Sequence, residues 1–355
     1  MASGEETVVL SATALARLYG GLLHHAGVPE SDAALAADTM VDADLRGVHS
    51  HGATWIPTYV KALRAGWINP RPSIRIVTRR GAGVTLDGDN GMGQLASIVG
   101  IKLAIEKARQ YGVGMVEVRN SNHNGAMAYY TEMAARQDMI GFAATNGGAI
   151  MAAVGGVSPR LGSNPFSYAF PAGKELPVIF DMACCIVAWS KFALYKAKGE
   201  KIPLGWALDK EGVPTDDPEK AMEGLVLPVG EHKGYGLALG VDLLCGVLSG
   251  AAFNGDTIIS WPQPNNLGHS LVAIDPSSFM PLGEFKARVD EEIRRMHDSV
   301  RASGVEHIWL PGERSQLTRA ARLRAGIPML RSVIEGLQRL GREMGMSEEE
   351  LSWKD

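Results

Sequence analysis

Two histidines, His49 and His51, flank a serine in the stretch RGVHSHGATW (46–55). An imidazole can transfer protons near neutral pH or bind a divalent metal. A metal site built on a His-X-His pair needs further ligands, and the chain contains no HxxxH or CxxC pattern to supply them. Proton transfer by one histidine, held by Ser50 or a nearby carboxylate, is therefore the better-supported interpretation, with a metal site as the alternative.

A third histidine stands in the cluster RNSNHNGA (119–126). The cluster follows the apolar stretch GMVEV (114–118) and precedes the helical stretch YYTEMAARQ (129–137). Where a strand leads into a helix, unpaired backbone N–H groups point outward and favour anion binding and catalysis. Helix capping would explain the Asn and Ser residues but not His123, which we therefore predict to be functional.

Four further clusters of polar residues or glycine stand at the ends of predicted elements: GSNP (162–165), FDMA (180–183), EHKGYG (231–236) and LPGE (310–313). Each is weak alone, because Asn-Pro is a common turn and an acidic residue after a strand can cap the next helix. The carboxylate of Asp181 could equally accept hydrogen bonds from a ribose or an imidazole.

The glycine fingerprint of a classical dinucleotide-binding fold is missing. Gly91-Met92-Gly93 lacks the third glycine, and no strand precedes GYGLALG (234–240). We predict that GYGLALG is a helix with small residues on a packing face. The pattern does not support a Rossmann βαβ unit.

The elements that must position these residues alternate between short apolar runs and helical stretches, a mixed α/β pattern. Ser11 and Ser31 are predicted to cap two N-terminal helices, and another helix spans 56–65. Strands are predicted at 73–78, 83–88, 114–118, 140–145, 166–170, 177–182 and 270–275. Helices are predicted at 95–110, 125–137, 184–198, 234–250 and 283–303, with two more after Pro311.

This order suggests a helical domain made from both chain ends, residues 1–72 with 312–355, around an α/β body at 73–311. The α/β body would bind the cofactor and carry the catalytic site. A division of this body into two subdomains, with boundaries near residues 120 and 250, is an open alternative.

The composition is that of a folded globular protein: 355 residues, 46% hydrophobic and 21% charged, with a formal net charge of −4. The slightly acidic balance argues against a nucleic-acid partner, and no apolar run reaches the roughly 18 residues of a membrane span. The N-terminus, MASGEETVVL, does not resemble a secretion signal. Three cysteines form no disulfide framework, so we expect a reducing, cytoplasmic location.

Six motifs occur in one order along nearly the whole chain: DLRGVHSHG, RNSNHNGA, GSNPF, FDMA, HKGYG and LPGE. In this order they resemble the type-2 malate/L-lactate dehydrogenase family, which includes ureidoglycolate and sulfolactate dehydrogenases and piperideine-carboxylate reductases. The resemblance implies a non-Rossmann α/β body with a mixed sheet, flanked by helices from both chain ends. It also implies NAD or NADP as cofactor, no metal, a small-molecule substrate and a homodimer.

The resemblance assigns roles to individual residues. It implies that His51 donates a proton to the substrate with support from Ser50, and that His123 lies at the nicotinamide end and can act as acid or base. Trp189 and Ser190 match substrate-side positions. The positions that it implies for cofactor binding are His123, Asn124, Gly125, Ala126, Ser163, Asp181, Met182, Ala183, His232, Lys233, Pro311, Gly312, Glu313 and Arg314.

One residue departs from the family pattern. Four residues after the histidine of SHG the family carries an Arg that pairs with the substrate carboxylate, whereas this chain has Trp55. An indole offers one neutral donor in place of a bidentate guanidinium. Either another cation, such as Arg46 or Lys191, binds the carboxylate, or Trp55 contacts a larger, flatter or cationic substrate.

We therefore predict an NAD(P)-dependent oxidoreductase that acts on a 2-keto or 2-hydroxy acid, a related carbonyl or a cyclic imine. Two alternatives are a metal-dependent hydrolase that uses His49 and His51, and a catalytically silent binding protein on the same fold.

Overall fold

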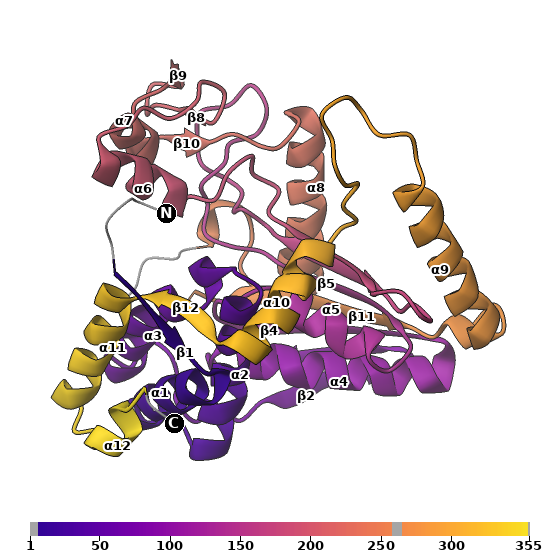
Figure 1. Cartoon of the computed structure of the whole chain (residues 1–355), viewed down its shortest axis with the longest axis horizontal. Helices are drawn as coiled ribbons and strands as arrows, with labels where there is room; N and C mark the ends of the chain where they lie inside the picture. Colours follow the sequence, from indigo (N-terminus) through magenta and orange to yellow (C-terminus); the bar gives the residue numbers. More distant parts are fainter. Residues whose placement is uncertain (1–5, 258–264, 354–355) are drawn as a thin grey trace.

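The computed structural model describes residues 6–257 and 265–353, and its centre is a seven-stranded mixed sheet (Figure 1). The strand order is β2-β3-β4-β11-β5-β6-β7, and only the β3–β4 pair is parallel. A Rossmann fold needs a parallel sheet, so the non-Rossmann prediction is confirmed. The strands are β2 (Arg75–Arg80), β3 (Gly83–Asp87), β4 (Val113–Ser121), β5 (Ile140–Thr145), β6 (Phe166–Phe170), β7 (Val178–Met182) and β11 (Leu267–Ile274).

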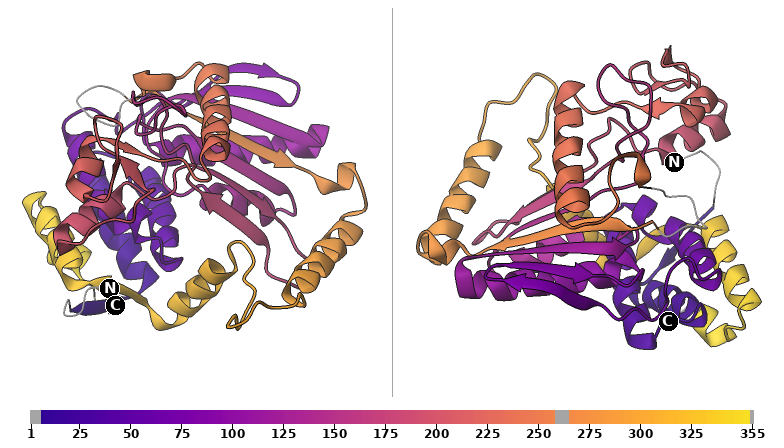
Figure 2. Two further views of the ribbon diagram at one scale, coloured as in Figure 1. Left: turned by 90° about the horizontal axis from the view of Figure 1, so that it is seen from above. Right: turned by 180° about the vertical axis from the view of Figure 1, so that it is seen from behind.

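Helices cover both faces of this sheet (Figures 1 and 2). Consecutive strand residues point to opposite faces, and β5 shows the consequence. Ala143 belongs to the core formed with α4 (Gly93–Tyr111) and α5 (Ala128–Ala135), whereas Ala144 packs with Val241 and Cys245. Those two partners lie on α8 (His232–Asp242) and on the π-helical segment η3 (Leu243–Leu248) that continues it.

Helices from the two chain ends share a second core. Strand β1 pairs antiparallel with β12, with Thr7 opposite Leu330. Apolar side chains from both ends fill this core, among them Leu15, Leu22, Tyr59 and Leu337. The elements are β1 (Thr7–Leu10), α1 (Ala12–His25), α2 (Glu30–Leu45), α3 (Ile56–Arg64), β12 (Ile327–Leu330), α11 (Arg331–Glu343) and α12 (Glu348–Leu351).

A smaller lobe stands above the sheet in Figure 1 and has its own apolar core, which includes Phe192 and Ala207. It contains α6 (Ser190–Lys198), α7 (Pro218–Glu223) and a three-stranded sheet of β8 (Ala207–Leu208), β9 (Pro214–Thr215) and β10 (Leu225–Val226). Two further helices, α9 (Leu282–His297) and α10 (Glu313–Ala325), follow the last strand of the main sheet. None of the helices in the described ranges is long and apolar enough to span a membrane.

Most predicted elements are present, with shifted ends. Ser11 caps α1, because its hydroxyl accepts a hydrogen bond from the backbone N–H of Ala14 at 3.0 Å. The cap predicted at Ser31 is wrong: α2 begins at Glu30, after Pro29, so Ser31 lies inside the first turn. The helix predicted at 184–198 begins only at Ser190, because Cys184 and Cys185 hydrogen-bond to neighbouring segments in extended form.

Candidate active site

The loop that carries His51 is built around one buried carboxylate, Asp44 at the end of α2. Asp44 accepts hydrogen bonds from the Tyr19 hydroxyl at 2.9 Å and from the Ala53 backbone N–H at 3.1 Å. A Cβ on Gly52 would lie 2.2–2.3 Å from the Asp44 carboxylate, so only glycine fits there. The glycine of the SHG motif therefore allows the chain to turn closely over Asp44.

His49 and His51 point to different surroundings. His49 Nδ1 lies 2.7 Å from Asp44 Oδ1, and its Nε2 accepts a hydrogen bond from Arg322 Nη1 at 3.2 Å. Both nitrogens of His49 are thus engaged in holding the loop. His51 Nδ1 lies 3.0 Å from Ser50 Oγ, which leaves Nε2 for a substrate. The structure therefore separates the two histidines and gives no support to a shared metal site.

His123 follows β4 and lies beside His51, with ring centroids 5.7 Å apart. Its Nδ1 is 2.5 Å from the hydroxyl of Tyr59 on α3. That hydroxyl already accepts a hydrogen bond from Gln94 Nε2 at 2.9 Å, so its own proton points to His123 Nδ1. His123 consequently carries its proton on Nε2 and presents an N–H donor to the site.

Gly93 of the GMG stretch has a structural role near His123, in place of a dinucleotide fingerprint. A Cβ on Gly93 would lie 2.0 Å from the Asn122 carbonyl, so glycine allows α4 to begin against the segment that carries His123. This contact places Gln94, the second residue of α4, beneath Tyr59.

Trp55 covers the other side of His123. The two rings stack with centroids 4.0 Å apart and an interplanar angle of 11°. His51, His123 and Trp55 thus form a row of aromatic rings, with His123 between its neighbours. All three residues keep partial solvent exposure.

Burial lowers the pKa of both histidines. The pKa of His51 is lowered because surrounding protein atoms exclude water from the ring. The pKa of His123 lies well below its usual value, because burial is joined by repulsion from His51 and His269. Both rings are therefore neutral at pH 7. A neutral His51 can accept a proton during alcohol oxidation, and its protonated form can donate one during reduction.

His269 lies fully buried below this pair. Its Nδ1 is 2.8 Å from Thr145 Oγ1, and its Nε2 is 2.9 Å from Ser121 Oγ. Burial lowers the pKa of His269 to about 3, so it stays neutral. It ties the ends of β4 and β5 to β11 at the base of the site.

The segments with predicted cofactor-binding residues meet around β7, the edge strand that ends in the FDMA motif. Asp181 Oδ2 accepts the Ala128 backbone N–H at 2.8 Å, which brings β7 next to the segment 123–126. Cys184 N–H donates to the Ser163 carbonyl at 2.7 Å, and Val229 N–H donates to the Cys184 carbonyl at 2.9 Å. These bonds join FDMA to GSNP and to the turn before the HKGYG helix.

The LPGE turn completes this band on the other side of β7. The Ile179 N–H donates to the Pro311 carbonyl at 3.2 Å, and a Cβ on Gly312 would lie 2.2 Å from the Ile179 carbonyl. Crowding by neighbouring protein atoms raises the pKa of Asp181 to about 6, against the lowering effect of the Ala128 N–H and of Arg46, although the residue as a whole is exposed to solvent. Met182 and Ala183 are half-buried, and His232 and Lys233 lie exposed in the first turn of α8.

Backbone shape near His123 fits a ligand that approaches closely. Gly125 has φ +79°, a conformation that favours glycine, and open space lies where its Cβ would be. Asn124 is buried, and its Oδ1 has no hydrogen-bond partner among the described residues. The donors and the open space of this band fit an extended polar molecule such as a dinucleotide.

The predicted substrate residues Trp189 and Ser190 lie apart from the histidines. Trp189 packs against Phe192 in the small lobe, with ring centroids 5.4 Å apart. Ser190 is exposed at the start of α6. Within the described ranges, no hydrogen bond or ring contact joins either residue to His51 or His123.

Neither Arg46 nor Lys191 is placed to bind a substrate carboxylate in the way expected of the family's Arg. The guanidinium of Arg46 is buried between Asp42 and Glu132, with Nε 2.5 Å from Asp42 Oδ2. Lys191 lies exposed on α6. Arg46 is thus neutralised by two carboxylates, and the wall beside His123 is the uncharged indole of Trp55.

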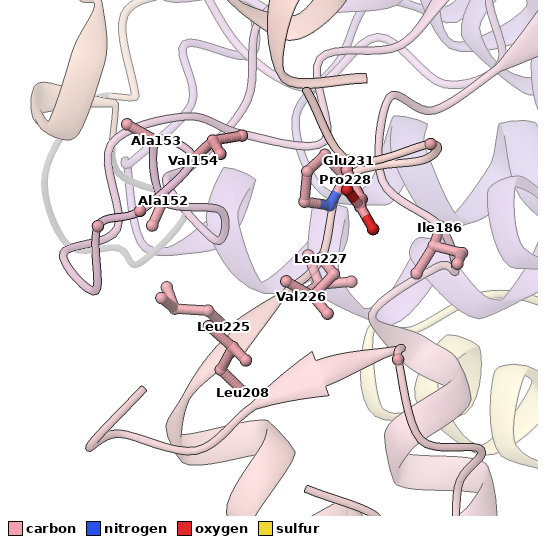
Figure 3. A pocket seen from close by; sticks show the side chains of 14 residues that line it. Ala152, Ala153, Val154, Ile186, Leu208, Leu225, Val226, Leu227, Pro228 and Glu231 are labelled. Atoms are coloured by element: carbon pink, nitrogen blue, oxygen red, sulfur yellow. The ribbon is translucent and has the colours of Figure 1, made fainter. Parts of the chain in front are cut away.

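A cavity of about 500 Å³ lies between the small lobe and the N-terminus of α8 (Figure 3). Its wall is largely apolar, and among the described residues Glu231 is the only charged one that lines it. The cavity lies next to FDMA through Ile186 and next to HKGYG through Gly230, but His51 and His123 do not line it. Among the described residues, the cavity lacks a pair of titratable groups comparable to His51 and His123, so the two histidines are the better candidates for proton transfer.

Sequence reasoning missed Tyr59, Gln94 and Asp44. Tyr59 and Gln94 lie on predicted helical stretches, where the sequence pattern predicts only that such residues pack in the core. Asp44 carried a signal, since the acidic helix end VDADL directly precedes the histidine loop. The structure shows that Asp44 holds the histidine loop, because it bonds to Tyr19, His49 and the Ala53 backbone.

Comparison with known proteins agrees with this geometry. Residues 10–338 match the family model described as malate/L-lactate dehydrogenase. The chain is 41% identical to the malate dehydrogenase of Pyrococcus abyssi over 90% of each chain.

Solved structures show the same likeness. The sulfolactate dehydrogenase of Methanocaldococcus jannaschii superposes with a TM-score of 0.89 at 40% identity, over 96% of this chain and 99% of that one. The Δ1-piperideine-2-carboxylate reductase of Pseudomonas syringae superposes with a TM-score of 0.86 at 30% identity, over 94% of this chain and 99% of that one. The chain therefore belongs to the malate/L-lactate dehydrogenase family, whose named members are oxidoreductases, as its six ordered motifs predicted.

Proposed function

We propose that this oxidoreductase transfers a hydride between NAD or NADP and a 2-keto or 2-hydroxy acid, a related carbonyl or a cyclic imine, with His51 as proton donor and acceptor. The observation that carries this proposal is the pairing of His51 and His123, whose ring centroids lie 5.7 Å apart with one nitrogen of each already bound. The relatives act on hydroxy acids and on an imine, as their names state.

The two histidines divide the work. The cofactor supplies or accepts the hydride when it is bound. Reduction of C=O or C=N leaves charge on oxygen or nitrogen, and protonated His51 relieves that charge through Nε2 while Ser50 holds Nδ1. His123 remains neutral and donates a hydrogen bond from Nε2, which polarises the same bond. The band around β7 would hold the dinucleotide through Ser163, Asp181, Lys233 and the turn 311–314.

Replacing His51 by Ala or Gln tests the proton-transfer role. We expect kcat to fall about 10²–10⁴-fold while the affinity for NADH or NADPH, followed by nicotinamide fluorescence, changes little. In the wild type the reduction rate should fall as pH rises through the pKa of His51, because the protonated donor is lost. Undiminished turnover in both variants would refute the assignment, and absence of binding of either cofactor would refute the function.

The stacking of Trp55 on His123 supports a substrate that is larger or flatter than a simple keto acid, or one that carries a cationic group. The indole face can bind a flat or cationic group, but it cannot pair with a carboxylate through two hydrogen bonds. The proposed reaction on such a substrate still uses His51 and His123.

Trp55→Arg measures this preference. We expect kcat/KM for small 2-keto acids to rise about tenfold or more, because a guanidinium would then face the substrate carboxylate. The assay compares small keto acids with cyclic imines and bulkier keto acids, each with NADH and NADPH. If the variant loses activity on small keto acids, Trp55 does not stand at the carboxylate position.

A homodimer and a cytoplasmic location complete the proposal. Leu239, Leu243 and Val247 recur every four residues along α8 and η3 and are 38%, 51% and 49% exposed. Gly236 and Gly240, on the same helix, have open space where a Cβ would lie. A second copy of the chain would cover this apolar face. The three cysteines are free and buried, which suits a reducing compartment.

A further inference from the structure

Two histidines and one glutamate converge at the junction of α9 and α10, and the glutamate, Glu313, also belongs to the turn 311–314 that is proposed to hold the dinucleotide. His297 is the last residue of α9, Glu313 is the first residue of α10, and His307 lies in the segment 298–312 that arches between them (Figure 1). Of all His, Cys, Asp and Glu side chains in the described ranges, only these three form a group whose ligand atoms lie within 4.8 Å of one another. We propose that His297, His307 and Glu313 bind a transition-metal dication of the zinc type.

The distances suit such an ion. His297 Nε2 lies 3.1 Å from Glu313 Oε2, and His307 Nε2 lies 3.3 Å from Glu313 Oε1. Ligand atoms at the corners of a tetrahedral zinc site with bonds of 2.0–2.1 Å are about 3.4 Å apart. The two histidines contact different oxygens of Glu313, and one ligand atom from each of the three residues lies within 4.8 Å of the others. Binding of one ion would therefore draw the three side chains together. Two imidazoles and one carboxylate also form a ligand set that zinc prefers.

The surroundings orient the ligands and leave room for the ion. Glu313 Oε2 also accepts the Leu310 backbone N–H at 3.0 Å, so the carboxylate is held in place. His307 is 43% exposed, which allows entry from solvent and leaves a fourth position for water. Partial burial would raise the pKa of Glu313, but the hydrogen bonds from Leu310, His297 and His307 lower it, so the carboxylate is ionised.

One neighbouring charge opposes binding. The guanidinium of Arg314 lies over the ring of Trp309, 5.6 Å from its centroid, and Trp309 contacts His307 at 4.2 Å between ring centroids. The positive charge on Arg314 opposes binding of a cation nearby, so we expect micromolar rather than nanomolar affinity.

Binding of Zn²⁺ to the chelator-treated, tag-free full chain tests the site. Competition with a chromophoric chelator should show one bound ion per chain, and Co²⁺ should give the visible absorption of a tetrahedral site. His297→Ala and His307→Ala should each weaken Zn²⁺ binding at least about tenfold, since each removes one of three ligands. Affinity should fall at acid pH, because protons compete for both imidazoles.

The pair His25–Glu350 provides a matched control, with Nε2–Oε1 at 3.0 Å and no third ligand in the group. His25→Ala should leave Zn²⁺ binding unchanged. Circular dichroism of each variant shows whether it is folded, and Zn²⁺ should raise the melting temperature of the wild type and of His25→Ala more than that of the two site variants. The proposal is wrong if the wild type binds no Zn²⁺, or if its affinity is unchanged in both site variants. Neither measurement depends on enzymatic activity, so this site stands or falls separately from the proposed function.

Discussion

The state of His123 depends on two neutral side chains that never reach the substrate. Gln94 donates to the Tyr59 hydroxyl, and that hydroxyl donates to His123 Nδ1. Burial raises the pKa of Tyr59 far above its usual value, so the phenol remains a donor at any physiological pH. The low pKa of His123 keeps the ring neutral. These conditions favour His51 as the proton carrier and make His123 a fixed hydrogen-bond donor.

Tyr59→Phe removes the group that sets this tautomer. We expect kcat to fall about tenfold and stability to fall by about 1–3 kcal/mol, because the Gln94 amide and His123 Nδ1 lose a buried partner. Nitrogen NMR of histidine-labelled protein, with the signal assigned through His123→Gln, should show the wild-type proton on Nε2. A wild-type proton on Nδ1 would contradict the proposed hydrogen-bond chain.

At the scale of elements, β4 and β11 carry two buried groups whose pKa values are shifted in opposite directions. Burial lowers the pKa of His269 to about 3. Burial raises the pKa of Glu117 to about 7, although the Ser270 hydroxyl donates to it at 2.8 Å and lowers it. The other carboxylate oxygen of Glu117 has no partner, which is consistent with a protonated acid.

These shifts predict opposite effects of pH on stability. Below about pH 6.5 His269 binds a proton in the unfolded state but not in the folded state. Its contribution to the free energy of unfolding is therefore fully present above about pH 6.5 and is lost as pH falls toward about 3. Above about pH 4.5 Glu117 stays protonated in the folded state while the unfolded state loses the proton. Its contribution to the free energy of unfolding is therefore present below about pH 4.5 and is lost as pH rises through about 7. Between these limits each group changes the free energy of unfolding by about 1.4 kcal/mol per pH unit.

Urea unfolding of wild type, His269→Gln and Glu117→Gln at about pH 5 and about pH 6.5 separates the two groups. The stability of wild type relative to His269→Gln should rise by about 2 kcal/mol over this range, and relative to Glu117→Gln it should fall by about the same amount. Differences that do not vary with pH would show that neither group titrates as described.

For the whole molecule, the exposed apolar residues on α8 and η3 define one face, which contains Leu239, Leu243 and Val247. Exposed apolar patches of this kind mark association sites in water-soluble proteins. Association here would cover the helix whose first turn carries His232 and Lys233, so dimer formation and cofactor binding would share one element.

Leu243→Glu tests this face by placing a charge where a second copy would pack. We expect the wild type to sediment as a dimer and the variant to shift toward monomer, because a buried unpaired carboxylate is costly. Leu204→Glu is the control, since Leu204 is 70% exposed on the small lobe, away from this face. A monomeric wild type, or an unchanged dimer in Leu243→Glu, would contradict the proposed interface.

The sequence by itself determined the mixed α/β class, the absence of a Rossmann fold and the membership of the family. Strand alternation, helix periodicity and glycine spacing are local properties, so β5, β6 and α1 could be predicted near their observed bounds. The domain boundaries and the individual catalytic, cofactor and substrate residues stay predictions.

Only the tertiary structure decided which polar residues meet. His49 and His51 are equivalent by residue type, and the family resemblance alone singled out His51; the structure shows the physical difference, because Asp44 and Arg322 hold His49 and not His51. The strands β1 and β12 were missed, because each is short and is stabilised only by its pairing with the far end of the chain. A titratable group acquires its proton affinity and its orientation from burial and from partners distant in sequence, and no local pattern contains that information.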